Sequence, residues 1–249
     1  MHKSNHHTHK SNHHTHKSYN HVINQLQDYM MTGKLYLKYN NTSKKESKSS
    51  NKSNKSNKSM NLITIKDQDQ LFWYYYIAMN SYDDYKYLDH KFTKEKELKI
   101  QNIETMKNNN SILKQNKIKI SDYETDLLNS KQISLSTLRG LCAYNEVNII
   151  YIKDKIYYDF RFNDTQVPII IYKQGKTYSC NISPSLETIE MIKQKYYYID
   201  NPSKPINGIS SYKIKELSEI CKKLDINTRL ESGKPKNKKI LYEEIKAYL

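Results

Sequence analysis

Hydrophobic residues recur at helical spacing through the first half of the central region, residues 61–200. The first such stretch predicts a helix over residues 67–80, with an apolar face at Leu71, Phe72, Tyr75, Tyr76 and Met79. N-cap residues followed by further periodic stretches predict three more helices: from Thr93 to about Met106 with Leu98, Ile103 and Met106 inward, from Ser121 to Asn129, and from Ser134 or Ser136 to Tyr144.

The second half of this region changes to short runs of β-branched and aromatic residues. These runs predict two hairpins, with strands over residues 147–152 and 156–162, and over residues 168–172 and 177–182, the latter pair turning at Gln174–Gly175–Lys176. Ser185 is a suitable N-cap for a last helix to about Gln194. Helices followed by hairpins indicate an α+β fold for this domain.

Residues 201–249 form a separate pattern with two amphipathic stretches. The first predicts a helix from Tyr212 to about Leu224, with a stripe of Ile214, Leu217, Cys221 and Leu224. Asn237 is expected to cap a second helix, residues 238–249, that carries Leu241 and Ile245 on one face. The loop between them contains Gly233 and Pro235. Two short helices can bury these stripes only against each other, so a small two-helix module is predicted.

Residues 1–60 have the composition of a low-complexity arm. The heptapeptide HKSNHHT occurs twice, over residues 2–8 and 9–15, and a repeat of Ser, Asn and Lys follows over residues 50–58. Neither repeat can bury an apolar face, so the arm is predicted to be disordered. Closely spaced imidazoles can share a metal ion. A drifting repeat explains the same composition and is favoured, so no metal site and no cofactor is predicted.

The charge is uneven along the chain. The formal net charge is +15, from 41 Lys and Arg against 26 Asp and Glu. Residues 1–60 carry +9, residues 61–200 carry +1, and residues 201–249 carry +5. Basic ends favour contact with a polyanion. Lysine enrichment in an AT-rich genome accounts for the bias equally well.

Aromatic residues cluster in the nearly neutral centre, at Phe72–Tyr76 and Tyr196–Tyr198. Such rings can stack on bases. At helical spacing and with little net charge around them, they are more typical of a hydrophobic core, which is the interpretation we prefer.

The candidate nucleic-acid site lies in the C-terminal module. Lys234, Lys236, Lys238 and Lys239 crowd the start of the second predicted helix, where the helix dipole and free N–H groups favour phosphate. Lys222, Lys223 and Arg229 are expected to extend this patch from the first helix. Only three residues of the chain are arginine, so backbone contact is expected rather than base readout. The alternative is a basic face kept for solubility.

The same module resembles a known group of helix–extended-loop–helix domains. The pattern is Ile214-Lys-Glu-Leu217, Ile220-Cys-Lys-Lys-Leu224, Gly233-Lys234 and Lys239-Ile-Leu241-Tyr-Glu-Glu-Ile245. It is similar to SAP-type modules and the Rho-termination-factor N-terminal-like domain. The resemblance implies DNA binding, or a protein contact as in relatives of the SAP type. The loop before Gly233 is longer than is usual in that group.

Residues 67–72, Asp-Gln-Asp-Gln-Leu-Phe, resemble the Asp-Gly-Asp-Cys-Leu-Phe start of ovarian-tumour-type cysteine peptidases. Gln70 stands where the family has its nucleophilic cysteine, and a carboxamide cannot replace a thiolate. No histidine follows His90, so Cys142 and Cys180 lack the family's downstream base. The resemblance therefore implies an inactive peptidase fold used for binding.

The chain as a whole resembles uncharacterised proteins of large nucleocytoplasmic DNA viruses in its Asn, Lys and Tyr bias. That resemblance implies residence in the host cytoplasm, at virus factories, or in the virion. No signal peptide and no apolar run of roughly 18 residues is visible, so neither secretion nor a membrane partner is expected.

The chain also lacks a phosphate-binding glycine loop and a zinc motif. The leading hypothesis is a non-enzymatic protein that binds nucleic acid, DNA in preference to RNA, while the central domain binds another partner such as a protein. The rivals are a structural or scaffold protein of a virus particle and the inactive peptidase fold.

Overall fold

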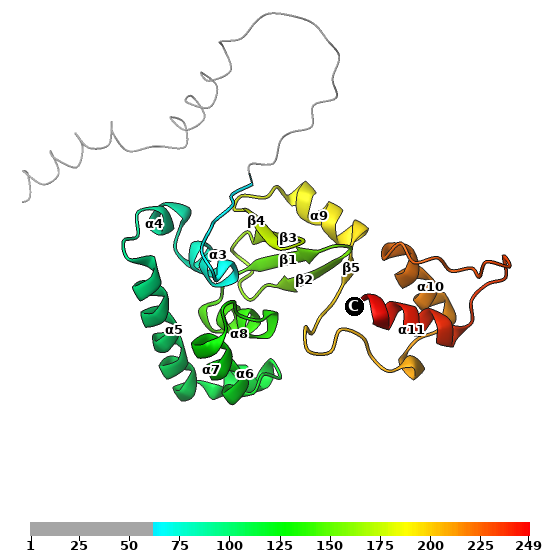
Figure 1. Ribbon diagram of the computed structural model, residues 1–249, viewed down its shortest axis with the longest axis horizontal. Coiled ribbons are helices and arrows are strands. Elements are labelled where there is room, and N and C mark those ends of the chain that lie inside the picture. Colours follow the sequence, from blue (N-terminus) through cyan, green and yellow to red (C-terminus); the bar gives the residue numbers. More distant parts are fainter. Residues whose placement is uncertain (1–61) are drawn as a thin grey trace, which may run out of the picture. The chain divides into compact units, whose positions relative to one another are not determined.

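The computed structural model describes residues 62–249, coloured along the chain in Figure 1. The expected disordered arm, with its histidine repeats, lies outside the described residues. The prediction of a chain that combines helices with a β-sheet is confirmed over the part described.

Six helices form the first part of the central domain. They are α3 (Gln70–Met79), α4 (Tyr82–Lys86), α5 (Lys91–Asn108), α6 (Asn110–Gln115), α7 (Ile120–Asn129) and α8 (Leu135–Asn145). The aromatic cluster of α3 is core, as predicted: Phe72, Trp73, Tyr74 and Tyr75 are all buried. Met79, placed on the apolar face by its spacing, ends the helix with 39% of its surface exposed.

N-cap residues were predicted correctly for some helices and wrongly for others. Ser134 and Ser185 each accept a hydrogen bond from the backbone N–H three residues on, as an N-cap does. Thr93 is not an N-cap, because α5 begins at Lys91, after His90 turns the chain with a φ of 49°. Ser121 is not one either, since Ile120 packs against the core and already belongs to α7.

Five strands form one mixed sheet in the order β4-β3-β1-β2-β5. The strands are β1 (Ile149–Lys153), β2 (Ile156–Phe160), β3 (Ile169–Gln174), β4 (Thr177–Asn181) and β5 (Tyr197–Tyr198). Both predicted hairpins are present as antiparallel pairs, β1 with β2 and β3 with β4. Gly175 turns the second hairpin with a φ of +58°, a conformation that glycine adopts without strain. The hairpins join through the parallel pair β1–β3.

The sheet is covered on both faces. Alternate residues of β1 point to opposite sides, so that Ile149 and Tyr151 join the core with α3 and α8. Ile150 and Ile152 pack instead with Ile189 of α9 (Leu186–Lys195). Figure 1 shows this arrangement, with α9 on one side of the sheet and α3 and α8 on the opposite side. The central strands are therefore apolar on both faces.

The C-terminal part contains a short 3₁₀ helix, η1 (Ile209–Ser211), then α10 (Ile214–Lys223) and α11 (Lys238–Tyr248). Leu217, Cys221, Leu224, Leu241 and Ile245 are buried, so the two predicted stripes lie in a core. Ile214 is an exception with 48% of its surface exposed. The helix starts at Ile214 rather than Tyr212 because residues 209–211 already form the 3₁₀ turn. Ile214 is thus the first helical residue, at the rim of the core.

Asp126 of α7 gives a pH-dependent contribution to stability. Burial acts to raise its pKa, but hydrogen bonds from Thr137, Ser134 and Ser130 outweigh burial and hold the pKa below its usual 3.8. A carboxyl group whose pKa is lower in the folded state than in the unfolded state stabilises the fold at pH values above its unfolded pKa. This stabilisation is lost as the pH falls through the folded pKa. We expect Asp126→Asn to lower the free energy of unfolding at pH 7 and to leave it almost unchanged at about pH 2. Urea unfolding at both pH values measures this, and an equal loss at both would contradict it.

Candidate nucleic-acid interface

The loop between α10 and α11 is folded back on itself. Arg229 forms an antiparallel bridge with Pro235, and the Lys236 N–H donates to the Thr228 carbonyl at 2.9 Å. Leu230 and Lys234 are joined by a hydrogen bond of 2.9 Å, and Gly233 makes the turn with a φ of +79°. The segment expected to be simply extended is therefore a tight hairpin, which leads directly into the start of α11.

Asn237 caps α11 as predicted, because its Oδ1 accepts from the Ile240 N–H at 2.9 Å. The N–H groups of Lys238 and Lys239 have no acceptor within the helix, as is general for a first turn. Among the described residues, the side chains of Lys234, Lys238 and Lys239 make no ion pair. Three uncompensated cations thus lie beside free backbone donors.

Lys236 has a different role from its neighbours. Its Nζ donates to both carboxylate oxygens of Glu244, at 2.6 and 2.8 Å, and its side chain is only 12% exposed. This pair ties the end of the hairpin to the second turn of α11. Its charge is neutralised, so Lys236 positions the loop instead of presenting a cation.

The two helices run in the same direction, which separates the predicted patch. Tyr242, in the second turn of α11, donates to the Asn207 carbonyl at 2.9 Å, and the Asn207 N–H donates to the Tyr212 hydroxyl. These contacts place the second turn of α11 beside the segment that leads into α10, and in Figure 1 the two helices start on the same side of the C-terminal part. Lys222 and Lys223 are exposed at the far end of α10, about 15 Å along a helix of that length. The structure does not bring them to Lys238 and Lys239.

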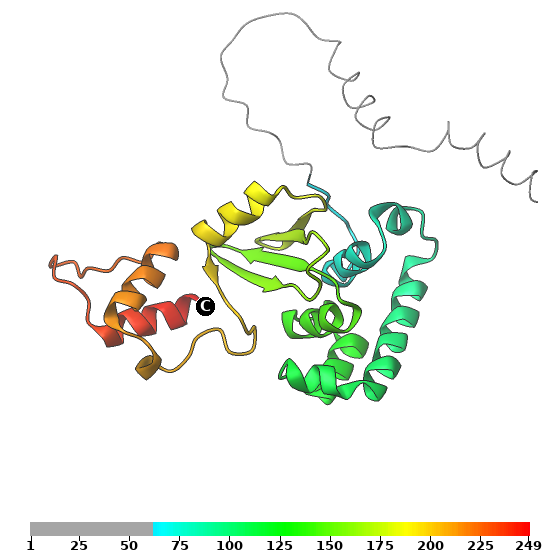
Figure 2. The same ribbon diagram turned by 180° about the vertical axis from the view of Figure 1, so that it is seen from behind.

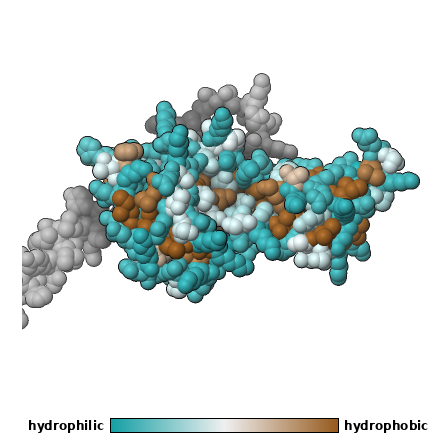
Figure 3. All heavy atoms as spheres, turned by 60° about the horizontal axis from the view of Figure 1, so that its bottom comes forward, coloured by the Kyte–Doolittle hydropathy of each residue, from teal (hydrophilic) through white to brown (hydrophobic). Residues whose placement is uncertain are grey.

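The start of α10 also carries two lysines that were not among the predicted site residues. Lys213 and Lys215 stand at the beginning of α10 and are exposed, and the Glu216 carboxylate accepts from the Lys213 backbone N–H at 2.7 Å. Arg229 lies in the hairpin, with Nη1 directed to the Gly233 carbonyl at 3.3 Å. We call Lys213, Lys215, Arg229, Lys234, Lys238 and Lys239 the basic end of the module. On the face of the module seen in Figure 3, hydrophilic residues surround several small hydrophobic patches.

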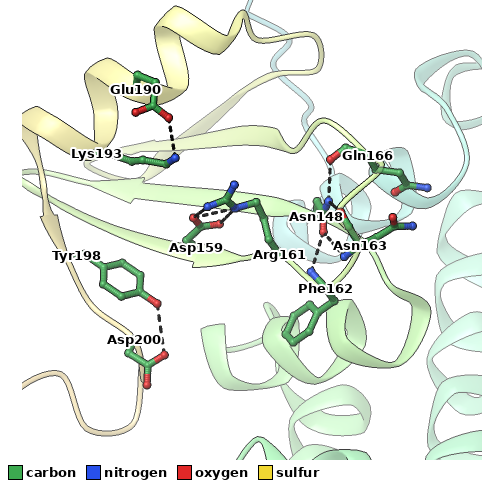
Figure 4. A network of polar contacts seen from close by, with 10 residues as sticks. All are labelled: Asn148, Asp159, Arg161, Phe162, Asn163, Gln166, Glu190, Lys193, Tyr198 and Asp200. Atoms are coloured by element: carbon green, nitrogen blue, oxygen red, sulfur yellow. Dashed lines mark hydrogen bonds and ion pairs between the residues drawn. The ribbon is translucent and has the colours of Figure 1, made fainter.

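A hollow lies on the central domain, on the α9 side of the sheet, and Figure 4 shows several of its polar residues. Its volume is about 540 Å³. Arg161 is held by Asp159 through three contacts of 2.6–2.9 Å, and Lys193 pairs with Glu190 at 2.7 Å. The hydrogen bond to Asp159 raises the pKa of Arg161 further. Both cations of this pocket are thus compensated, in contrast with the basic end.

One wall of this pocket is the loop of residues 161–168, and Asn148 fixes it. The Asn148 Nδ2 donates to the carbonyls of Asn163 and Gln166, and its Oδ1 accepts from the N–H groups of Phe162 and Asn163. Figure 4 shows these residues as one polar cluster at the start of β1. Asn148 is buried, so the loop depends on these bonds.

The residues that resemble a peptidase start are packed into the structure. Gln70 is the first residue of α3, and its Nε2 donates to the Ile65 carbonyl. Cys142 and Cys180 are completely buried, and burial raises the pKa of both thiols well above the usual value. A cysteine nucleophile needs the opposite, a lowered pKa and access to substrate. His90 is exposed at the start of α5.

Within residues 62–249, no group of three potential metal ligands comes together, and no helix has the length and hydrophobicity to cross a membrane. No family model, curated protein or solved structure matches this chain. Its own residues therefore carry the functional argument.

Proposed function

We propose that this chain is a non-enzymatic protein that binds the phosphate backbone of nucleic acid, DNA in preference to RNA, through the basic end of its C-terminal module. The observation that carries the proposal is a group of three lysines at the start of α11 that make no ion pair among the described residues: Lys234 and Lys239, which are exposed, and Lys238, which is half-buried. Lysine binds phosphate as a point charge and does not read bases in the bidentate manner of arginine. Binding of this kind depends on phosphates and only weakly on sequence.

The arrangement of charges supports one end of the module over the other. At the basic end, lysines from α10, the hairpin and α11 surround N–H groups that favour an anion. Lys236 is withdrawn from contact by Glu244, and it keeps the hairpin close to α11. Lys222 and Lys223 lie at the opposite end, where α10 ends in carbonyl groups and offers no free N–H groups to an anion, and the nearby Asp225 pairs with Lys155 at 2.6 Å. We therefore leave Lys222, Lys223 and Lys236 out of the proposed contact surface.

Two matched double variants of the full chain test this proposal. Each variant removes two positive charges from neighbouring lysines, and the two pairs lie at opposite ends of the module. The variants are Lys238→Gln/Lys239→Gln and Lys222→Gln/Lys223→Gln. Each lost phosphate contact reduces the slope of log K against log salt by about 0.9 for duplex DNA. We expect the first variant to lose about 1.8 from this slope, for two contacts, and the second to lose almost nothing. Fluorescence anisotropy with duplex DNA, at several salt concentrations, measures it.

Three results would count against the proposal: no binding of the unaltered chain at low salt, binding that salt does not change, or equal effects of the two variants. Duplex RNA of the same sequence is the comparison for the preference. Tighter binding of RNA would overturn that part alone.

A further inference from the structure

A second group of uncompensated lysines lies on the central domain, far along the sequence from the basic end. They surround a pocket of about 480 Å³ formed by the first described residues, by α4 and by the start of α5. Lys66, Lys86 and Lys91 line it, and none of them makes an ion pair among the described residues. In Figure 2, α4 and the start of α5 lie together at one end of the helical part.

The short helix α4 separates its charges by face. Its sequence is Tyr-Asp-Asp-Tyr-Lys, and Tyr82, Tyr85 and Lys86 line the pocket, whereas Asp83 and Asp84 do not. Residues three and four apart share a helix face, which explains this segregation. Asp84 instead accepts from the Ser81 hydroxyl at 2.6 Å. The two carboxylates of α4 thus leave the pocket's lysines uncompensated.

The one carboxylate in the pocket is already engaged. Asp67 accepts a hydrogen bond from the Tyr85 hydroxyl. The Lys91 ammonium lies over the face of the Tyr85 ring, 3.8 Å from its centroid, and not beside a carboxylate. His90, with its positive φ, turns the chain so that Lys91 begins α5 at this position. The pocket therefore holds three cations against a single, hydrogen-bonded anion.

We infer that this pocket binds the phosphate of a ligand about the size of a nucleotide. Three lysines that line one hollow supply positive charge for a phosphate, and the pocket's volume lies in the range typical of small-ligand sites, about 300–1,000 Å³. The Lys86 ammonium lies over the Tyr87 ring, 5.3 Å from its centroid, and not beside a carboxylate. Tyr82 is half-buried and stacks on Tyr85 at 6.0 Å between centroids, which offers a flat wall for a planar group. A free nucleotide and the terminal phosphate of a strand share this chemistry.

The single tryptophan provides a local reporter. The Trp73 ring lies 5.6 Å from the Tyr85 ring, so ligand binding beside Tyr85 is expected to change Trp73 fluorescence. The full chain would be titrated with inorganic pyrophosphate, a nucleoside 5′-monophosphate and the unphosphorylated nucleoside, at constant ionic strength, with calorimetry as a second measurement. We expect saturable binding of the two phosphate-bearing probes and none of the nucleoside.

Variants locate the site. Lys66→Gln, Lys86→Gln and Lys91→Gln are each expected to weaken pyrophosphate binding about tenfold, since each removes a charge-assisted hydrogen bond to the phosphate. Lys176→Gln, at the exposed turn of the second hairpin, removes the same charge and is expected to change nothing. No saturable heat with either phosphate probe, or equal loss in the Lys176 variant, would overturn the inference.

Binding is then measured in the Lys238→Gln/Lys239→Gln variant, whose basic end is expected to bind nucleic acid more weakly. This measurement distinguishes a free nucleotide from the terminal phosphate of a strand. A preference for a 5′-phosphorylated oligonucleotide over its unphosphorylated copy would identify a strand end, and binding of the mononucleotide alone would identify a free nucleotide. Because this pocket and the basic end lie on different elements, either site can fail its test while the other passes.

Discussion

Replacing Lys99 with methionine is expected to lower the free energy of unfolding by about 3–5 kcal/mol. Lys99 is buried in α5 with only 1% of its surface exposed, and its Nζ contacts the Asp69 Oδ2 at 2.6 Å and the Glu95 Oε1 at 2.8 Å. Methionine fills a similar volume but leaves the fully buried Asp69 carboxylate without its cation. Urea unfolding followed by Trp73 fluorescence measures the loss.

The loss is expected to depend on pH in a defined direction. Burial raises the pKa of Asp69, while the hydrogen bond and charge of Lys99 oppose that rise. Without Lys99 the pKa rises further, so the variant takes up a proton more readily on folding. Its disadvantage relative to the unaltered chain should therefore be smaller at pH 5 than at pH 7.5.

A double variant separates the buried charge from simple loss of packing. Asp69 caps α3 by accepting from the Phe72 N–H, and it also accepts from the Ile133 N–H. An asparagine side chain at this position can keep the hydrogen bond from the Phe72 N–H without a charge, whereas its amide nitrogen replaces the oxygen that accepts from the Ile133 N–H. Lys99→Met/Asp69→Asn is therefore expected to recover part of the loss, because the buried charge is removed and one hydrogen bond is given up. A single variant that costs less than about 1 kcal/mol, or a double variant with additive losses, would contradict the account.

This ion pair also shows what the sequence could not reveal. Local signals succeeded where the partners are close in the chain, as at Ser134, Ser185 and Asn237, whose caps depend on the next three residues. Lys99 lies in a strongly charged stretch and has the pattern of a solvent-exposed residue. Its partner Asp69 is thirty positions away. Only tertiary packing brings the two together.

The same distinction applies to the basic end. The lysines beside α11 could be predicted, because a helix start and its neighbours are local features. The contribution of Lys213 and Lys215 could not, since it depends on the two helices running in the same direction. The ion pair that removes Lys236 from the contact surface could not be predicted either, because it forms only where the hairpin of the loop brings Lys236 close to Glu244. In the sheet, the parallel pairing of β1 with β3 was equally inaccessible to local reasoning.

Asn148→Ala is expected to cost about 3 kcal/mol of unfolding free energy and to loosen the wall of the α9-side pocket. The change removes the amide donor and the acceptor that serve Phe162, Asn163 and Gln166. Each buried group left without a partner costs about 1–3 kcal/mol, and water can relieve part of that in a half-buried loop. Hydrogen exchange at the Phe162 and Asn163 amides should accelerate more than exchange in β1.

Asn148→Asp is the matched control for this prediction, because it keeps the acceptor and removes only the donors. It should still protect the Phe162 and Asn163 amides, while its second oxygen faces the carbonyls of Asn163 and Gln166 and repels them. We therefore expect a comparable loss of stability but slower amide exchange than in Asn148→Ala. If both variants exchange alike at these two amides, Asn148 acts through packing alone and the loop is held by its other contacts.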